Sequence, residues 1–359
     1  ECRRGAMEPA AKRLRGEEPR GLVLLEHVNM NIDDEGLGQR FFEALGCQRQ
    51  TAVPIKIHMN CGPHTQFHLP VEPQDPQTWR GEITVAYTAE GLEAAERRLR
   101  AFAATEEGAK CEIVKEEEEK KADEGGGVAA PEGFASLSSS VLRVRDPWGN
   151  RHRLRAGTAA EHEMARLPTK RPNTAESLAL GVLGIVGISI PVDPGSAKGL
   201  ADFYAEVFAF ETTAAEGSAA AIGGPVPGAQ RITFEEQPGG APPWPGDHLC
   251  FYMTGLEECF RRCQERGLLY VNPRFTWLDN SRSLEALAKW QAFRIKDVRA
   301  GTPEGAQACL AREEHEIRSV RHWGLPLAGY EALPTPPETA DMVRRMRDLG
   351  GTGGSAGAA

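Results

Sequence analysis

The sequence has neither an excess of basic residues nor a long apolar run. Its 359 residues include 42 Lys and Arg against 51 Asp and Glu, which gives a formal net charge of -9. Because phosphate binding needs a basic face, nucleic acid is not expected as the main partner. No run of eighteen or more apolar residues predicts a membrane span, and the charged start, ECRRGAMEPAAKRLRGEEPRG, lacks the apolar segment of a secretory signal. We therefore expect a soluble protein of the cytoplasm.

The cysteines also lack a recognisable pattern. The chain has 8 of them, without the close regular spacing of a disulfide framework and without a CxxC pair. This scatter predicts reduced thiols. The short basic run KRLR at residues 12–15 resembles a nuclear import signal, although such runs also occur in disordered termini without that role.

Residues 24–32, LLEHVNMNI, alternate in polarity as a β-strand would. Side chains of a strand point to two faces in turn, so His27, Asn29 and Asn31 would share one face. The other face would carry Glu26, Val28, Met30 and Ile32. Two hypotheses fit the polar face. It belongs to a surface strand that meets water, or it is the wall of a polar cavity in which His27 is a ligand or a base.

The following residues complete a first unit of strand, helix and strands. A helix is predicted at about 35–45 and ends at Gly46, a residue type that tolerates the left-handed conformation of a helix C-terminus. Extended segments follow at about 49–59 and 64–69. The unit is then repeated, because GEITVAYTAEGLEAAERRLRAF predicts a strand and an amphipathic helix, and the turn DPWGN joins two further strands.

The second half of the chain restates the first. LGIVGISIPVDPGSAKGLADFYAEVFAFET answers the opening segment, and GDHLCFYMTGLEECFRRCQERG answers the start of the second unit. The chain is therefore predicted to be an α+β protein of four such units in two tandem domains. The predicted division is a disordered N-terminus at 1–20, a first domain at 21–156 with an acidic low-complexity insertion at about 106–133, a linker at 157–182, a second domain at 183–333 and a tail at 334–359.

Three segments of the first half, LEHVNMNIDDEGLGQRFFEALG, GPHTQFHLP and DPWGNRHRL, resemble the vicinal oxygen chelate superfamily. That superfamily includes glyoxalase I, fosfomycin and bleomycin resistance proteins, and extradiol dioxygenases. The resemblance covers about residues 22–155 and, more loosely, 183–322. It implies βαβββ units that pair into half-open barrels, whose concave faces hold a ligand and often a divalent metal.

The resemblance also implies where ligands would stand, because metal ligands in this superfamily come from the first and last strands of each unit. In the first half these positions are held by His27, His68, Glu82 and Arg153. A guanidinium has no lone pair for a metal, so the implied ligands are His27, His68 and Glu82, which would suit Fe, Mn, Ni, Co or Zn. An ion pair between Arg153 and Glu82 in a metal-free pocket explains the same residues.

The other candidate roles follow from the same placement. Glu82 and Arg153 are the candidate catalytic residues, and Gln66, Arg153 and Asn29 are the candidate substrate-binding residues. In the second half Gly187 stands opposite His27 and offers no ligand. Candidate ligands there are Glu235, His248 and one of Glu314 or Glu316, although a solvated, salt-bridged strand end would look the same.

These observations favour a small-molecule cavity in the first domain. The predicted function is that of a metal-dependent lyase or dioxygenase acting on a substrate with vicinal oxygens. The alternatives are a metal-free protein that binds or sequesters a small anionic ligand, and a structural subunit with vestigial sites. A monomer or a homodimer is expected.

Overall fold

The computed structural model describes residues 21–50, 57–72, 75–117, 140–300 and 308–350. The KRLR run and most of the predicted acidic insertion lie outside these residues. Over the described residues the chain forms four successive units of the predicted kind. The expected α+β fold of four βαβββ units is therefore confirmed.

The elements of the units are as follows. Unit 1 consists of β1 (Leu22–Asn29), α2 (Glu35–Leu45), β2 (Gln48–Gln50), β3 (Ile57–Cys61) and β4 (Thr65–Leu69). Unit 2 consists of β5 (Glu82–Tyr87), α3 (Ala89–Ala103), β6 (Glu112–Glu117), β7 (Ser140–Arg145) and β8 (Arg151–Ala156). Unit 3 consists of β9 (Val182–Val192), α6 (Ala197–Phe208), β10 (Glu211–Ala215), β11 (Ser218–Gly223) and β12 (Gln230–Glu236). Unit 4 consists of β13 (His248–Met253), α7 (Leu256–Glu265), β14 (Leu269–Tyr270), α8 (Leu284–Trp290), β15 (Ala292–Arg299) and β16 (Cys309–Ser319).

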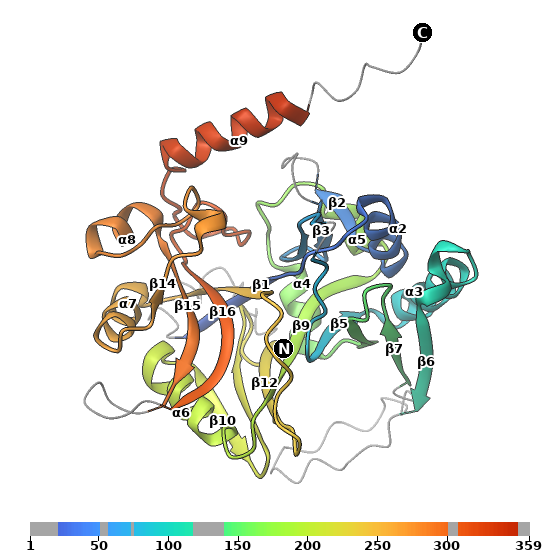
Figure 1. Cartoon of the computed structure of the whole chain (residues 1–359). Helices are drawn as coiled ribbons and strands as arrows, with labels where there is room; N and C mark the ends of the chain where they lie inside the picture. The colour runs from blue at the N-terminus through green and yellow to red at the C-terminus, as the bar shows by residue number, and fades with distance from the viewer. Residues whose placement is uncertain (1–20, 51–56, 73–74, 118–139, 301–307, 351–359) are drawn as a thin grey trace, which may run out of the picture.

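The units pair across the two halves of the chain. Two 8-stranded sheets form, in the orders β14-β15-β16-β13-β1-β4-β3-β2 and β10-β11-β12-β9-β5-β8-β7-β6. Strand β1 lies antiparallel to β13, and β5 lies antiparallel to β9. Unit 1 therefore shares a sheet with unit 4, and unit 2 with unit 3; in Figure 1 the blue β1 belongs to the same sheet as the orange and red β15 and β16. Among the described residues, units 1 and 2 therefore do not share a sheet, and the cup expected within the first half is not formed. The predicted residue boundaries of the two domains stay a prediction.

Helix α2 shows why the local elements follow the sequence closely. The Asp34 side chain accepts a hydrogen bond from the Leu37 backbone N–H, and Gly46 ends the helix at φ 100°. Phe41, Phe42 and Leu45 of its apolar face are buried in the core. The predicted helix at 35–45 and its stop at Gly46 are both confirmed.

The predicted linker contains more structure than its polarity suggested, whereas a short helix was expected in the tail. Residues 157–182 include α4 (Ala159–Arg166) and α5 (Ala175–Ala179), and Thr158 and Glu161 form a capping box at the start of α4. The tail begins with α9 (Pro337–Gly350). Among the described residues, no helix is both long and apolar enough to cross a membrane.

The pairing of β1 with β13 and of β5 with β9 predicts that the halves fold only together. A fragment of residues 1–182 would expose the edges of β1 and β5, which seek another strand. We expect residues 1–182 and residues 183–359 to be unfolded or aggregated when expressed alone, and to form a 1:1 complex when co-expressed. Size-exclusion chromatography and circular dichroism test this, and a well-folded monomeric first half would contradict it.

Candidate metal centre

The sheet pairing separates the four residues that we expected in one cup. His27 and His68 lie on β1 and β4 of one sheet, whereas Glu82 and Arg153 lie on β5 and β8 of the other. Glu82 accepts a hydrogen bond from Arg143 on β7, two strands away in the same sheet, and is partly exposed. Glu82 and Arg153 therefore do not converge with His27, because strands from unit 4, not unit 2, complete its sheet.

Unit 4 supplies what unit 2 does not. The donor atoms of His27, His248 and Glu316 lie within 4.8 Å of one another, and all three side chains are buried. Glu316 Oε2 is 3.5 Å from His27 Nε2 and 3.3 Å from His248 Nε2. The two histidines come from the paired first strands β1 and β13, and the glutamate comes from β16, the last strand of unit 4.

The other second-half candidates lie elsewhere. Glu314 faces His248 across the strands but accepts hydrogen bonds from Asn272 at 3.0 Å and from Arg294 at 2.7 Å. Glu235 is exposed on β12 of the opposite sheet. Of the two glutamates that we left open on β16, the structure therefore brings Glu316, not Glu314, to the histidines.

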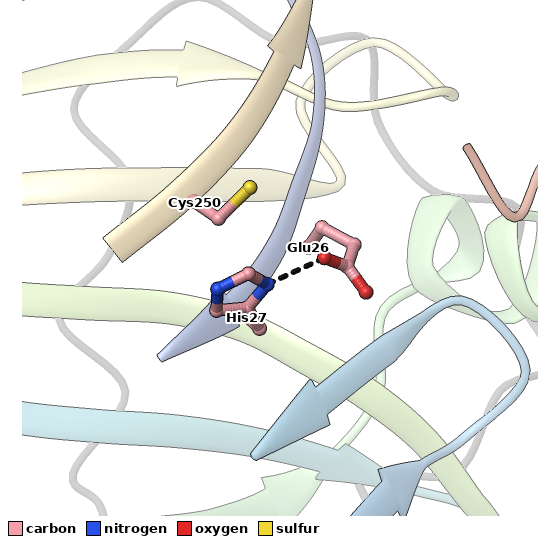
Figure 2. A group of neighbouring side chains, drawn as sticks. All are labelled: Glu26, His27 and Cys250. Carbon is pink, nitrogen blue, oxygen red and sulfur yellow. Dashed lines mark hydrogen bonds and ion pairs between the residues drawn. The ribbon is translucent and has the colours of Figure 1, made fainter. Parts of the chain in front are cut away.

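A bulge in β1 brings a further carboxylate to His27. Leu25 lies opposite Phe251 and His27 opposite Cys250, so that two residues of β1 advance for one of β13. A bulge of this kind breaks the strict alternation of faces. Glu26, which alternation assigned to the apolar face, instead lies beside His27 with its Oε2 2.5 Å from His27 Nδ1 (Figure 2).

The side chain of Gln230 fixes the backbone next to this bulge. Its Oε1 accepts from the Leu25 N–H at 2.8 Å, and its Nε2 donates to the Leu25 carbonyl at 2.8 Å and to the Ile185 carbonyl at 2.9 Å. Gln230 is completely buried on β12, in the other sheet. One amide thus satisfies backbone groups on both sheets and holds the position of His27.

Three arginines share the charges of the centre. Glu316 Oε2 is 2.8 Å from Arg294 Nη2, and Glu316 Oε1 is 2.5 Å from Arg318 Nη2. Glu26 pairs with Arg171, and its Oε2 is 3.6 Å from Arg318 Nη1. Burial by itself would raise the pKa of both carboxyls, but the surrounding guanidinium groups hold each pKa below its usual value. Glu26 and Glu316 are therefore ionised at neutral pH.

Burial favours the neutral form of two histidines of the cluster, His248 and His68. Burial, more than any other cause, lowers the pKa of His248 to about 4. Burial, more than any other cause, also lowers the pKa of His68 well below its usual value. The His68 ring stacks between two others, with centroids 3.6 Å from His27 and 3.7 Å from His58. Neutral imidazoles keep the lone pair that a metal requires.

His68 itself is turned to another partner. Its Nε2 lies 2.9 Å from Gln66 Oε1, while Gln66 Nε2 donates to Asn60 Oδ1 at 2.6 Å. Because an amide oxygen only accepts, His68 Nε2 carries the proton in this arrangement. Among the described residues, His68 belongs to neither of the groups whose donor atoms lie within 4.8 Å of one another.

The second of those groups, Glu26, His27 and Cys250, is a poorer site for a metal. Figure 2 shows that one nitrogen of His27 is bonded to Glu26 and that Cys250 comes from the neighbouring strand. Burial raises the pKa of the Cys250 thiol well above its usual value, so the thiolate that binds metals is disfavoured. The histidine–carboxylate hydrogen bond would also have to break.

A cavity of about 340 Å³ opens beside the centre. His248, Glu316, Asn29 and Gln66 line it, so that two candidate substrate-binding residues do face a cavity next to the donors. The rest of its wall comes from outside the sheet: the linker at 170–172, the segments at 275–278 and 322–326, and the first turns of α9. Its volume is in the range of small-molecule sites.

No protein-family model matches the sequence, and no curated protein matches it. Among solved structures, one from Bacillus subtilis described as a "putative dioxygenase" has a TM-score of 0.51 at 11% identity, covering 92% of this chain and 97% of its own. The chain has the vicinal oxygen chelate fold. Glyoxalase I from Zea mays also matches, with a TM-score of 0.46 at 10% identity, covering 91% of this chain and 95% of its own. The 2,3-dioxygenase LapB from Pseudomonas sp. KL28 matches with a TM-score of 0.29 at 13% identity, covering 90% of this chain and 99% of its own. At these identities the likeness concerns the fold alone.

Within the vicinal oxygen chelate fold, the sequence pointed to some residues of the centre and not to others. His27, His248 and Glu316 are all candidates from the sequence, but in different sites, because the sequence predicts that units adjacent in the chain pair with each other. Glu26 was missed because of the bulge. Its signal in the sequence was a lone charge on an otherwise apolar strand face.

One buried histidine outside the proposed centre, His64, makes the stability of the protein depend on pH. Burial and then the charge of Arg171 lower the pKa of His64 to about 4. Between pH 6.5 and 4 the unfolded chain binds a proton at His64 that the folded chain does not, so this residue makes the free energy of unfolding fall as pH falls. We expect the loss between pH 7.5 and 5 to be smaller by about 2 kcal/mol in His64→Leu.

Urea unfolding at the two pH values tests this difference. His162→Asn, on the surface helix α4, is the control and is expected to leave the loss unchanged. An identical pH dependence in wild type and His64→Leu would contradict the expectation.

Proposed function

We propose that the protein is a metal-dependent enzyme whose divalent ion is held by His27, His248 and Glu316. The observation that carries the proposal is the buried Nε2 of His27, which has no hydrogen-bond partner among the described residues and faces Glu316. A buried polar atom without a partner costs stability, so a ligand is the natural occupant of this position. The residues fit a divalent cation.

The surroundings of His27 support the same conclusion. Glu26 accepts from Nδ1, which assigns the proton to that nitrogen and leaves the lone pair on Nε2. A carboxylate behind a ligating histidine is the usual way in which proteins orient the ring and strengthen its bond to a metal. The low pKa of His248 and the ionised Glu316 place the other two donors in their binding forms.

The donor set indicates the kind of chemistry. Two imidazoles and one carboxylate with open positions are typical of Fe(II) oxygenases, although Mn, Ni, Co or Zn would also fit the ligands. When bound, the ion would act as a Lewis acid for two adjacent oxygens of a substrate. Three protein donors leave room for such a substrate and for a further small ligand, which favours a dioxygenase over a lyase. The protein's own residues would position the substrate through Asn29 and Gln66 on the cavity wall.

The two arginines at Glu316 favour the rival function, a metal-free protein that binds a small anionic ligand. Arg294 and Arg318 already neutralise the carboxylate of Glu316, and a cation placed there would have to coexist with them. The ion and the arginines are compatible because each carboxylate oxygen has two lone pairs. Metal analysis separates the two functions.

We expect the protein purified without chelator, or reconstituted with Fe(II) or Zn(II), to hold one ion per chain. His248→Ala and Glu316→Gln should each remove it, whereas Glu82→Gln should not, because Glu82 lies in the other sheet. Elemental analysis of the four proteins measures this.

The Glu82→Gln variant is the matched control. Glu82 would be a metal ligand if units 1 and 2, which are adjacent in the chain, formed the site together. Loss of the ion in Glu82→Gln would contradict the centre proposed here. Absence of metal from every preparation, with no uptake on addition, would favour the metal-free binding protein.

Glu26 offers a separate test of the arrangement behind His27. Glu26→Gln keeps the size of the side chain but loses the charge that orients the ring. We expect the affinity for Zn(II) to fall by about 10- to 100-fold, the usual cost of losing such a partner. Competition with a chromophoric chelator measures it, and Glu163→Gln on the exposed face of α4 serves as control. An unchanged affinity would show that Glu26 does not support a ligand.

A further inference from the structure

The linker between units 2 and 3 supplies a cation to the cavity wall. Lys170, Arg171 and Pro172 all line the cavity, although the sequence placed them in a polar connection between domains. The Arg171 side chain is only 7% exposed. Its Nη2 pairs with Glu26, whereas its Nη1 is buried without a hydrogen-bond partner among the described residues. One of the three nitrogens of this guanidinium, Nη1, is therefore left without a hydrogen-bond partner among the described residues.

The other arginines of the cavity are fully engaged. Arg294 uses its three nitrogens on Asp279, Glu314 and Glu316 at 2.7 to 2.8 Å. Arg318 bonds Glu316 through Nε and Nη2 and the Tyr252 hydroxyl through Nη1. Among these three buried arginines, Arg171 alone has a nitrogen that the described protein leaves unsatisfied.

The backbone that carries Arg171 is held firmly. Asn60 Nδ2 donates to the carbonyls of Pro172 at 3.2 Å and Asn173 at 2.8 Å. The Lys170 N–H donates to the Pro326 carbonyl at 2.6 Å. These bonds attach the linker both to β3 and to the loop after β16. The guanidinium is thus positioned in advance, which lowers the entropy cost of binding to it.

The linker is also joined to the polar wall of the sheet. Asn60 accepts from Gln66, and Gln66 bonds His68, whose ring stacks on His27. Arg171 also forms an ion pair with Glu26, and Glu26 is hydrogen-bonded to His27. A group bound at Arg171 would therefore lie one side chain away from the proposed metal ligand, within the length of a small molecule.

We infer that Arg171 binds a carboxylate of the substrate, an inference that rests on the proposed function for the position of the reacting oxygens. A buried guanidinium nitrogen without a partner is the natural donor to an oxyanion. An anion suits the charge of the wall, because Lys170, Arg171, Arg294 and Arg318 line the cavity against only two carboxylates, Glu26 and Glu316. The aromatic side chains of Phe275, Trp277 and Trp323 line the cavity and suit an apolar, planar body. The substrate class is an aryl carboxylic acid with two adjacent oxygens.

A matched pair of probes tests the inference. Catechol has two adjacent oxygens on a ring, and 3,4-dihydroxybenzoate adds one carboxylate to the same ring. We would measure the affinity of both by calorimetry under anaerobic conditions, with Zn(II)-loaded protein and with chelator-treated protein. The proteins are wild type, Arg171→Lys, Arg171→Gln and the control Arg166→Lys, which changes an exposed arginine of α4.

We expect wild type to prefer 3,4-dihydroxybenzoate over catechol by about tenfold, the effect of one charge-assisted hydrogen bond. Arg171→Lys keeps a charge for Glu26 but loses the forked geometry, so the preference should fall to about twofold or less without unfolding the protein. Arg171→Gln should abolish it, and Arg166→Lys should retain it. An equal preference in wild type and both Arg171 variants would overturn the inference.

The two metal states separate this inference from the proposed function. If the protein takes up no Zn(II), the proposed function fails, yet a carboxylate preference that depends on Arg171 would still appear in chelator-treated protein. If Zn(II) binds and strengthens catechol binding but the carboxylate adds nothing, the metal centre stands and the inference about Arg171 fails.

Discussion

The antiparallel pairing of β1 with β13 is the constraint on which the candidate site depends. It joins residues near the start of the chain to residues more than two hundred positions later, and so places His27 beside His248. The bulge in the same pairing turns Glu26 toward His27, and Gln230 satisfies the backbone that the bulge disturbs. Without this single strand pair, neither the donor set nor its supporting carboxylate would exist.

The charges around the centre are stable only as a set. Taking one carboxylate or guanidinium out of water costs several kcal/mol, which is repaid only when partners surround it. Here Glu316 is held by two arginines, and Arg294 by three carboxylates. Such a network fixes the protonation states of its members more firmly than any one pair would. Within the network, His27 Nε2, Arg171 Nη1 and Asp279 Oδ1 have no hydrogen-bond partner among the described residues, and the first two are the positions proposed for a ligand.

The segments outside the sheets determine the shape of the cavity. The linker, the loop after β16 and the first turns of α9 complete the wall around the centre. The hydroxyl of Thr339 in α9 donates to the Trp277 carbonyl at 2.7 Å, which attaches this helix to the aromatic side of the cavity. Units 1 and 4 thus provide the proposed reacting end, while connections between and after the units provide the surface for the rest of the substrate. Loops that are positioned by a rigid scaffold commonly have this role.

The sequence by itself determined the local elements and their repetition. Alternation predicted β1, capping and Gly46 fixed α2, and the repeated segments predicted four units of one fold, because these signals act over a few residues. The tertiary structure alone decided which units share a sheet, and with it that Glu82 and Arg153 are separated from His27 while His248 and Glu316 join it. Pairing between distant strands depends on the packing of the whole chain, and no local pattern records it. For the same reason the bulge at Glu26 and the attachment of Arg171 to the cavity appear only once the two ends of the chain have met.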